Sequence, residues 1–161
     1  MKKILFITAA IISILLTDCN AQKKEPAQAG NTELKADAII DNSSAPIHIN
    51  TADFKQRIFN YDVDKTWKYL GTKPCIIDIY ADWCPPCRVL SPVMEEVAKE
   101  FAGKVLIYKI NADKEKELMG YLGITSLPTL IFCPKEGQPQ ASLGAMPKAD
   151  VEKLVNSLLI K

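Results

Sequence analysis

Three features on which many functional sites depend are scarce or missing in this sequence. Histidine occurs once, at His48, so no cluster of imidazoles exists to hold a metal or to serve as a general base. Neither sign of charge is in excess: without residues 1–18, which carry two lysines and one aspartate, 18 basic and 18 acidic residues remain. This balance excludes the basic surface that binds nucleic acid. We expect His48 to be an ordinary strand or surface histidine.

A hydrophobic run long enough to span a membrane is also missing. The apolar stretch at residues 4–16 is shorter than the roughly 20 residues that a membrane-spanning helix needs. Because it directly follows Lys2 and Lys3, it is typical of a signal peptide, which we place at residues 1–20. The sequence therefore predicts export.

Two cleavage sites compete near the end of this signal. The residues ahead of Cys19 resemble a bacterial lipoprotein signal, in which the cysteine becomes the lipidated first residue. Asp18 departs from the small residue expected before that cysteine, which leaves ordinary cleavage near Ala21 as the alternative. Residues 21–45 are polar with few large apolar side chains, so we expect a flexible linker that would suit a tethered protein.

Residues 46–161 have the pattern of a single α/β domain. Apolar runs predict strands at 46–50, 75–81, 104–110, 128–133 and 140–143. Helical periodicity predicts helices at 51–59, 62–70, 85–101, 114–121 and 148–160. Strands and helices alternate at first, and a strand pair and a helix follow. This order favours a mixed sheet covered by helices on both faces.

The residues best suited to chemistry lie where strand 75–81 meets helix 85–101. Cys84 and Cys87 are separated by Pro85 and Pro86, whose missing N–H groups suit the start of a helix. At that position, unpaired backbone N–H groups and the helix dipole stabilise an anion. The position therefore favours the thiolate of Cys84, which is the form that attacks a disulfide. Cys87 lies one turn further along, where it can resolve the mixed disulfide.

A single acid, Asp78, lies in the otherwise apolar strand ahead of the two cysteines. A buried carboxyl group is costly to ionise, so its pKa should rise and it can pass a proton near pH 7. We predict that Asp78 takes the proton of Cys87 when that thiol attacks the mixed disulfide. A purely structural acid is the alternative.

Taken together, these motifs resemble the thioredoxin family over the whole of residues 46–161. The family pattern Trp-Cys-Gly-Pro-Cys corresponds to residues 83–87, with Pro85 in place of the glycine. The resemblance assigns a buried acid, a nearby lysine, a cis-proline and a hairpin glycine to Asp78, Lys109, Pro128 and Gly144. It implies the thioredoxin fold, with a central mixed sheet of about five strands flanked by helices. The export signal, together with Trp67, Gly71 and Pro74, is similar to periplasmic thioredoxins of Bacteroides-type bacteria.

The resemblance also implies a function and the residues that carry it. It implies a protein-disulfide reductase that needs no metal or organic cofactor, because the dithiol is the redox group. Lys109 would modulate Asp78, and a cis-proline would leave the backbone of Leu127 free to pair with an extended substrate. The shallow apolar groove around Cys84 would be framed by Trp83, Pro85, Pro86, Leu127, Pro128, Gly144 and Ala145.

The expected partners follow from that function. They are proteins with disulfides and, for a reductase, a membrane electron donor. The chain is expected to be a monomer in the periplasm of a Gram-negative bacterium, attached to a membrane only if Cys19 is lipidated. Cys75 and Cys133 fall in strands that run antiparallel in this family. We expect two inert buried thiols there, with a structural disulfide as the alternative.

Three other functions stay open at this stage. The residues between the two active cysteines tune the reduction potential, so a disulfide oxidase or isomerase is the first alternative. A metal carrier would use the same two cysteines, but soft-metal sites usually recruit further ligands that this sequence does not supply nearby. A non-catalytic binding module is the third alternative, and the intact Cys84 and Cys87 argue against it.

Overall fold

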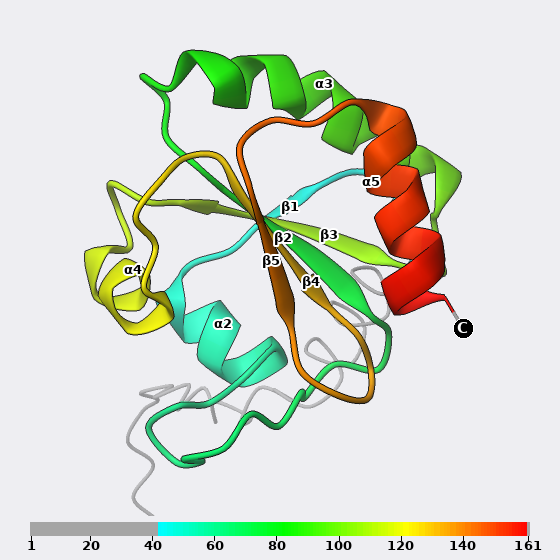
Figure 1. The fold of residues 1–161 in the computed structure, drawn as a ribbon. Coiled ribbons are helices and arrows are strands. Elements are labelled where there is room, and N and C mark those ends of the chain that lie inside the picture. The colour runs from blue at the N-terminus through cyan, green and yellow to red at the C-terminus, as the bar shows by residue number, and fades with distance from the viewer. Residues whose placement is uncertain (1–41, 161) are drawn as a thin grey trace, which may run out of the picture.

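The computed structural model describes residues 42–160, and in that range the chain forms a five-stranded sheet between two helical layers. This confirms the mixed sheet that the sequence pattern and the resemblance predicted (Figure 1). The predicted signal peptide, most of the predicted linker and Cys19 lie outside the described residues. Within the described part of the chain, no helix is long and apolar enough to cross a membrane.

The sheet has the order β1-β3-β2-β4-β5. Its strands are β1 (Ile47–His48), β2 (Cys75–Tyr80), β3 (Leu106–Asn111), β4 (Thr129–Cys133) and β5 (Gln140–Leu143). The first three are parallel to one another, whereas β4 is antiparallel to both β2 and β5. The helices are α2 (Thr51–Arg57), α3 (Pro85–Glu100), α4 (Lys116–Leu122) and α5 (Lys148–Leu154), which continues as the π-helical turn η1 (Val155–Leu159).

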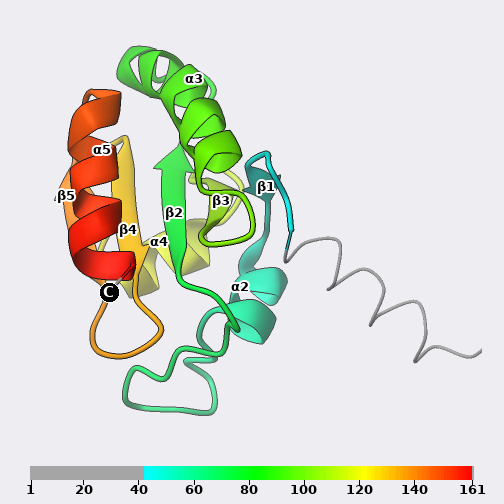
Figure 2. The ribbon, with the colours of Figure 1, turned by 90° about the vertical axis from the view of Figure 1, so that its right-hand side faces the viewer.

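Helices cover both faces of the sheet, with α3 and α5 on one side and α2 and α4 on the other (Figures 1 and 2). Successive side chains of a strand point to opposite faces, so Ile76 and Ile77 of β2 are buried in different cores. Ile76 packs with the α3 and α5 side chains, and Ile77 packs with Phe54 of α2 and Leu118 of α4. Because it is covered on both faces, β2 reads as an almost continuous apolar run.

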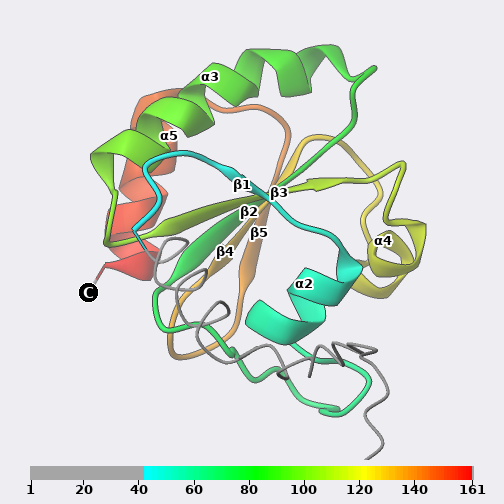
Figure 3. The same ribbon diagram turned by 180° about the vertical axis from the view of Figure 1, so that it is seen from behind.

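The helix predicted at residues 62–70 is wrong. Turns and irregular chain fill the whole connection from α2 to β2. Val63 is 72% exposed and Leu70 is 40% exposed, so the apolar residues that suggested a helix share no buried face. Trp67 instead packs on Phe59, with ring centroids 4.9 Å apart. The spacing of these residues resembles that of a helix, but here the aromatic side chain of Trp67 anchors a loop on the core. The predicted strand at 46–50 is also shorter, because β1 pairs with β3 at only two residues. It lies at one edge of the sheet, beside β3 (Figure 3).

The packing beneath α2 gives a prediction for stability. Phe54 is fully buried in the core on this side of the sheet. Phe54→Ala should lower the free energy of unfolding by about 3–5 kcal/mol, because it removes a large apolar side chain and leaves a cavity. Urea denaturation followed by circular dichroism measures this loss. The exposed Val63 provides the control, since Val63→Ala should change stability by less than about 0.5 kcal/mol. Equal effects of the two changes would contradict the packing described.

Candidate active site

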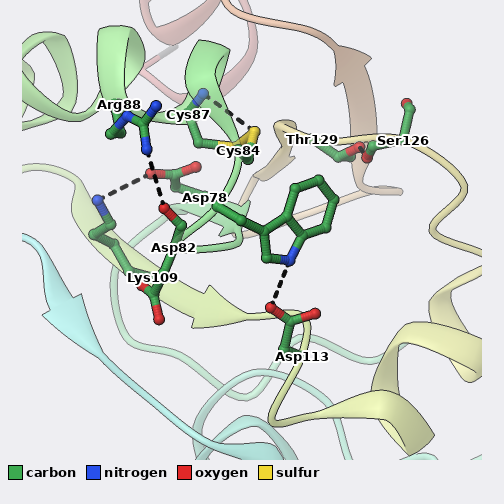
Figure 4. The surroundings of a disulfide bond; sticks show 10 residues. Asp78, Asp82, Cys84, Cys87, Arg88, Lys109, Asp113, Ser126 and Thr129 are labelled. Atoms are coloured by element: carbon green, nitrogen blue, oxygen red, sulfur yellow. Dashed lines mark hydrogen bonds and ion pairs between the residues drawn. A yellow bond between two sulfur atoms is a disulfide. The ribbon is translucent and has the colours of Figure 1, made fainter.

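The two cysteines lie at the end of the sheet where the chain leaves β2 and enters α3 (Figure 4). The N–H of Cys84 donates to the carbonyl of Ala81 at 3.2 Å, which closes the turn between strand and helix. Cys84 is the N-cap residue of α3, and Pro85 and Pro86 occupy the first helical positions. The sequence folds this way because prolines start a helix without losing a hydrogen bond.

Cys84 and Cys87 form a disulfide, with their Cα atoms 5.3 Å apart. The sulfur of Cys84 accepts a hydrogen bond from the backbone N–H of Cys87 at 3.3 Å. Both side chains are buried, 2% and 5% exposed, although Pro85 and Pro86 between them are exposed. In the reduced state the same N–H would face a thiolate on Cys84. The helix start is therefore built to stabilise negative charge on the first sulfur.

Asp78 lies in β2 and is 1% exposed. Its Oδ2 is 3.4 Å from the Nζ of Lys109, the residue directly opposite it in β3. Burial raises the pKa of Asp78, and the nearby charge of Lys109 opposes part of that rise. In Figure 4 the carboxylate lies between Lys109 and the first turn of α3. A buried acid whose pKa is raised holds a proton more tightly than an exposed aspartate does, which is a property suited to proton transfer.

An apolar hollow opens beside the disulfide. It has a volume of about 440 Å³ and is lined by Trp83, Cys84, Pro85, Pro86, Ala112, Asp113, Met119, Ile124, Thr125, Ser126 and Leu127. The indole of Trp83 is 65% exposed, and its Nε1 donates to Asp113 at 2.8 Å (Figure 4). This bond fixes the ring as part of the lining, to which Leu127 and Ile124 also contribute. An exposed aromatic wall beside a disulfide suits an apolar segment of a substrate.

The loop before β4 completes this side of the site. The Leu127–Pro128 peptide bond is cis. The hydroxyl of Thr129 donates to the carbonyl of Ser126 at 2.8 Å, and the N–H of Gly144 donates to the carbonyl of Pro128 at 2.8 Å. Among residues 42–160 no hydrogen bond uses the backbone of Leu127, which leaves that residue free to pair with an extended chain.

Three predicted groove residues lie apart from this hollow. Gly144 has φ of +83°, in the left-handed region that favours glycine, and it follows β5 next to Pro128. Pro128, Gly144 and Ala145 do not line the hollow that Trp83 borders. The structure therefore brings Trp83, Pro85, Pro86 and Leu127 together with Cys84 around the hollow, whereas the other three do not line it.

Cys75 and Cys133 are directly opposite each other in the antiparallel pair of β2 and β4. Both are fully buried, and both are free thiols. Hydrogen bonding to Cys75, together with burial, raises the pKa of the Cys133 thiol well above its ordinary value. A protonated, buried thiol is a poor nucleophile, so this pair is expected to be inert.

Thiol counting tests that expectation. In the oxidised Cys19→Ser variant, a thiol reagent should find no reactive group in the native protein and two after denaturation, because burial alone protects Cys75 and Cys133. Cys133→Ala in the same background should lower the denatured count to one. Zero thiols after denaturation would mean that the two cysteines are joined, which would contradict the structure.

His48 is exposed at the edge strand, and its Nδ1 lies 3.3 Å from the hydroxyl of Tyr80. Among residues 42–160 no group of three or more histidine, cysteine or acidic side chains is placed to hold a metal ion.

Comparisons with known proteins agree with this geometry. The thioredoxin family model matches residues 46–157. A thioredoxin of Borreliella burgdorferi is 38% identical over 109 residues, which cover 68% of this chain and 93% of that protein. A thioredoxin of Haemophilus influenzae is 39% identical over 114 residues, 70% of this chain and 96% of the relative. A crystal structure of chloroplastic thioredoxin z has a TM-score of 0.60 at 28% identity, covering 70% of this chain and 93% of that one.

The chain therefore belongs to the thioredoxin family. It is a thiol–disulfide oxidoreductase of the kind that acts on protein disulfides through a redox-active dithiol, without a separate cofactor.

Sequence reasoning gave no role to three polar residues of the site. Asp113 orients Trp83, and Asn111 donates from its amide to Asp82 at 3.2 Å. Ser91 accepts a hydrogen bond from Lys109 at 2.8 Å. Asn111 is the last residue of β3 and Asp113 comes two residues later, so a search for polar residues at strand ends would have found them. Ser91 carries no such signal, because its partner is 18 residues away.

Proposed function

We propose that this protein is an exported thioredoxin that reduces disulfides in periplasmic proteins, with Cys84 as the attacking thiol and Cys87 as the resolving thiol. The observation that carries the proposal is the position of Cys84 as the N-cap of α3, with Cys87 one turn further along and a hollow beside them. The helix start favours a thiolate, and the hollow gives an extended substrate access to it.

The reaction balances without a cofactor. The Cys84 thiolate attacks one sulfur of a substrate disulfide, whose S–S bond breaks, and the other substrate sulfur leaves as a thiolate. Cys87 then gives its proton to the carboxylate of Asp78 and attacks the sulfur of Cys84, which releases the second substrate sulfur. The substrate gains two electrons, and the protein is left with the Cys84–Cys87 disulfide. For an exported protein, we expect a membrane electron donor to return the two electrons.

Reduction of insulin by dithiothreitol tests the proposed activity. The protein should accelerate the precipitation of the insulin B chain, because its dithiol exchanges with the insulin disulfides faster than the free reagent does. An isomerase would instead be recognised by reactivation of scrambled ribonuclease with little insulin reduction. Failure to accelerate insulin reduction would contradict the proposal.

Export and anchoring form the second part of the proposal. The signal at residues 1–20, the polar linker at 21–45 and the likeness to periplasmic thioredoxins of Bacteroides-type bacteria support a periplasmic location. Labelled palmitate should enter the full chain in cells and should not enter the Cys19→Ser variant, if Cys19 carries the anchor. Equal labelling of both proteins would contradict the lipid anchor, and recovery of the full chain in the cytoplasm would contradict export.

A further inference from the structure

The ammonium group of Lys109 lies between two neighbours, and the closer one is a hydroxyl group. Its Nζ donates to the Oγ of Ser91 at 2.8 Å, whereas the Oδ2 of Asp78 is 3.4 Å away. Ser91 lies in α3, one turn beyond Cys87. A side chain of the redox helix therefore binds the same cation that faces the buried acid.

Asp78 has few partners for a buried acid. Among residues 42–160 its buried Oδ1 has no protein hydrogen-bond partner, and its Oδ2 has the longer contact with Lys109. An ionised carboxylate gains most from short, charge-assisted hydrogen bonds, so their absence favours the protonated form. A closer approach of Lys109 would supply the strongest missing interaction and would make Asp78 a weaker base.

Other titratable groups near Lys109 come from β1, β2 and α3. A hollow of about 270 Å³ beside Lys109 is lined by Ser44, Ala45, Pro46, His48, Ser91, Glu95 and Lys99. The Tyr80 ring lies 4.8 Å from Nζ, and its hydroxyl group contacts His48. Among residues 42–160, Asp78 is nevertheless the only carboxylate in contact with the Nζ of Lys109. If the Ser91 hydroxyl were removed, Asp78 would be the carboxylate closest at hand for the ammonium.

We propose that Ser91 is a positioning residue for disulfide exchange: its hydroxyl holds the ammonium of Lys109 off the Asp78 carboxylate, which leaves Asp78 able to accept the proton of Cys87. This inference rests on the proton transfer proposed above for Asp78. The Ser91 hydroxyl binds the ammonium of Lys109, and its proposed effect on Asp78 passes through that group.

The test is a titration of Asp78 in the oxidised protein, which needs no turnover. Carboxyl carbons of aspartate are labelled with ¹³C and followed by NMR against pH, and the resonance missing in Asp78→Asn identifies Asp78. In Ser91→Ala, the titration midpoint of Asp78 should fall by about one pH unit, because an opposite charge moves closer. Ser91→Thr keeps the hydroxyl group and is the matched control, so its midpoint should stay at the wild-type value.

A kinetic readout separates positioning from a general structural effect. The pH midpoint for resolution of the mixed disulfide should shift by the same amount in Ser91→Ala, and Ser91→Ala should cause no shift in an Asp78→Asn background. An unchanged or raised midpoint of Asp78 in Ser91→Ala, or an equal fall in Ser91→Thr, would overturn the inference. If insulin reduction itself were absent, the proposed function would fail, while the NMR titration would still judge the contact between Ser91, Lys109 and Asp78.

Discussion

Cys84→Ser should abolish insulin reduction, and Cys87→Ser should leave the substrate covalently attached to Cys84. The first change removes the thiolate that attacks, so no mixed disulfide forms. The second change leaves the attack intact but removes the thiol that releases the substrate. Non-reducing gel electrophoresis with a disulfide-containing protein should therefore show a stable adduct for Cys87→Ser and none for Cys84→Ser. Dithiothreitol should reduce the mixed disulfide and release the substrate from the adduct.

The buried pair of cysteines supplies the control for this experiment. Cys75→Ala and Cys133→Ala should reduce insulin at nearly the wild-type rate once folded, since both side chains are fully buried in the sheet. An adduct that forms through Cys87 in the Cys84→Ser variant would reverse the assignment of attacking and resolving thiols.

Asp78→Asn should slow resolution of the mixed disulfide on the order of 100-fold near neutral pH, because no group is then placed to accept the proton of Cys87. The wild-type rate should rise with pH as Asp78 ionises, above the ordinary range of an aspartate. The rate of the variant should lack this rise and should depend only on ionisation of the Cys87 thiol. Stopped-flow tryptophan fluorescence across pH 5–9 measures both profiles. Identical profiles would remove Asp78 from the mechanism.

The same substitution should change how stability depends on pH. Burial raises the pKa of Asp78 in the folded protein. An acid with a raised folded pKa binds its proton more tightly in the folded state, so it stabilises the fold below its unfolded pKa and loses that contribution as the pH rises through its folded pKa. Relative to wild type, Asp78→Asn should therefore gain about 1.4 kcal/mol for each pH unit between the two pKa values. Urea unfolding at several pH values measures the free energy of unfolding of both proteins. The difference between the variant and the wild type should widen from acid to neutral pH.

The central fold was predictable because local pattern and tertiary structure agree there. β2 and β4 are buried on both faces and stand out as short apolar runs, and α3 has the caps and prolines of a helix start. The connection from α2 to β2 was misread because its aromatic residues are spaced like a helix but anchor a loop on the core. Periodicity alone does not separate these two cases.

In the candidate site, too, local sequence pattern places some residues and tertiary packing places others. Cys84, Cys87 and Asp78 lie within ten residues of one another, so a strand followed by a helix fixes their proximity. The contacts of Lys109 with Ser91 and of Trp83 with Asp113 join different elements across the sheet end. They depend on side-chain packing that no local pattern contains. Sequence alone therefore predicted the candidate reacting groups but gave no role to Ser91 and Asp113, which bind Lys109 and Trp83.

The most direct test of the account is the reduction potential of the Cys84–Cys87 pair, measured at equilibrium with a glutathione or dithiothreitol buffer. A reductase of the thioredoxin type predicts a value near −270 mV, so that the dithiol form can give electrons to protein disulfides. Pro85 in place of glycine makes this measurement informative, because the residues between the cysteines tune the potential. A value near −120 mV would mean that the protein introduces disulfides, which would contradict the proposed reductase while leaving the dithiol chemistry intact.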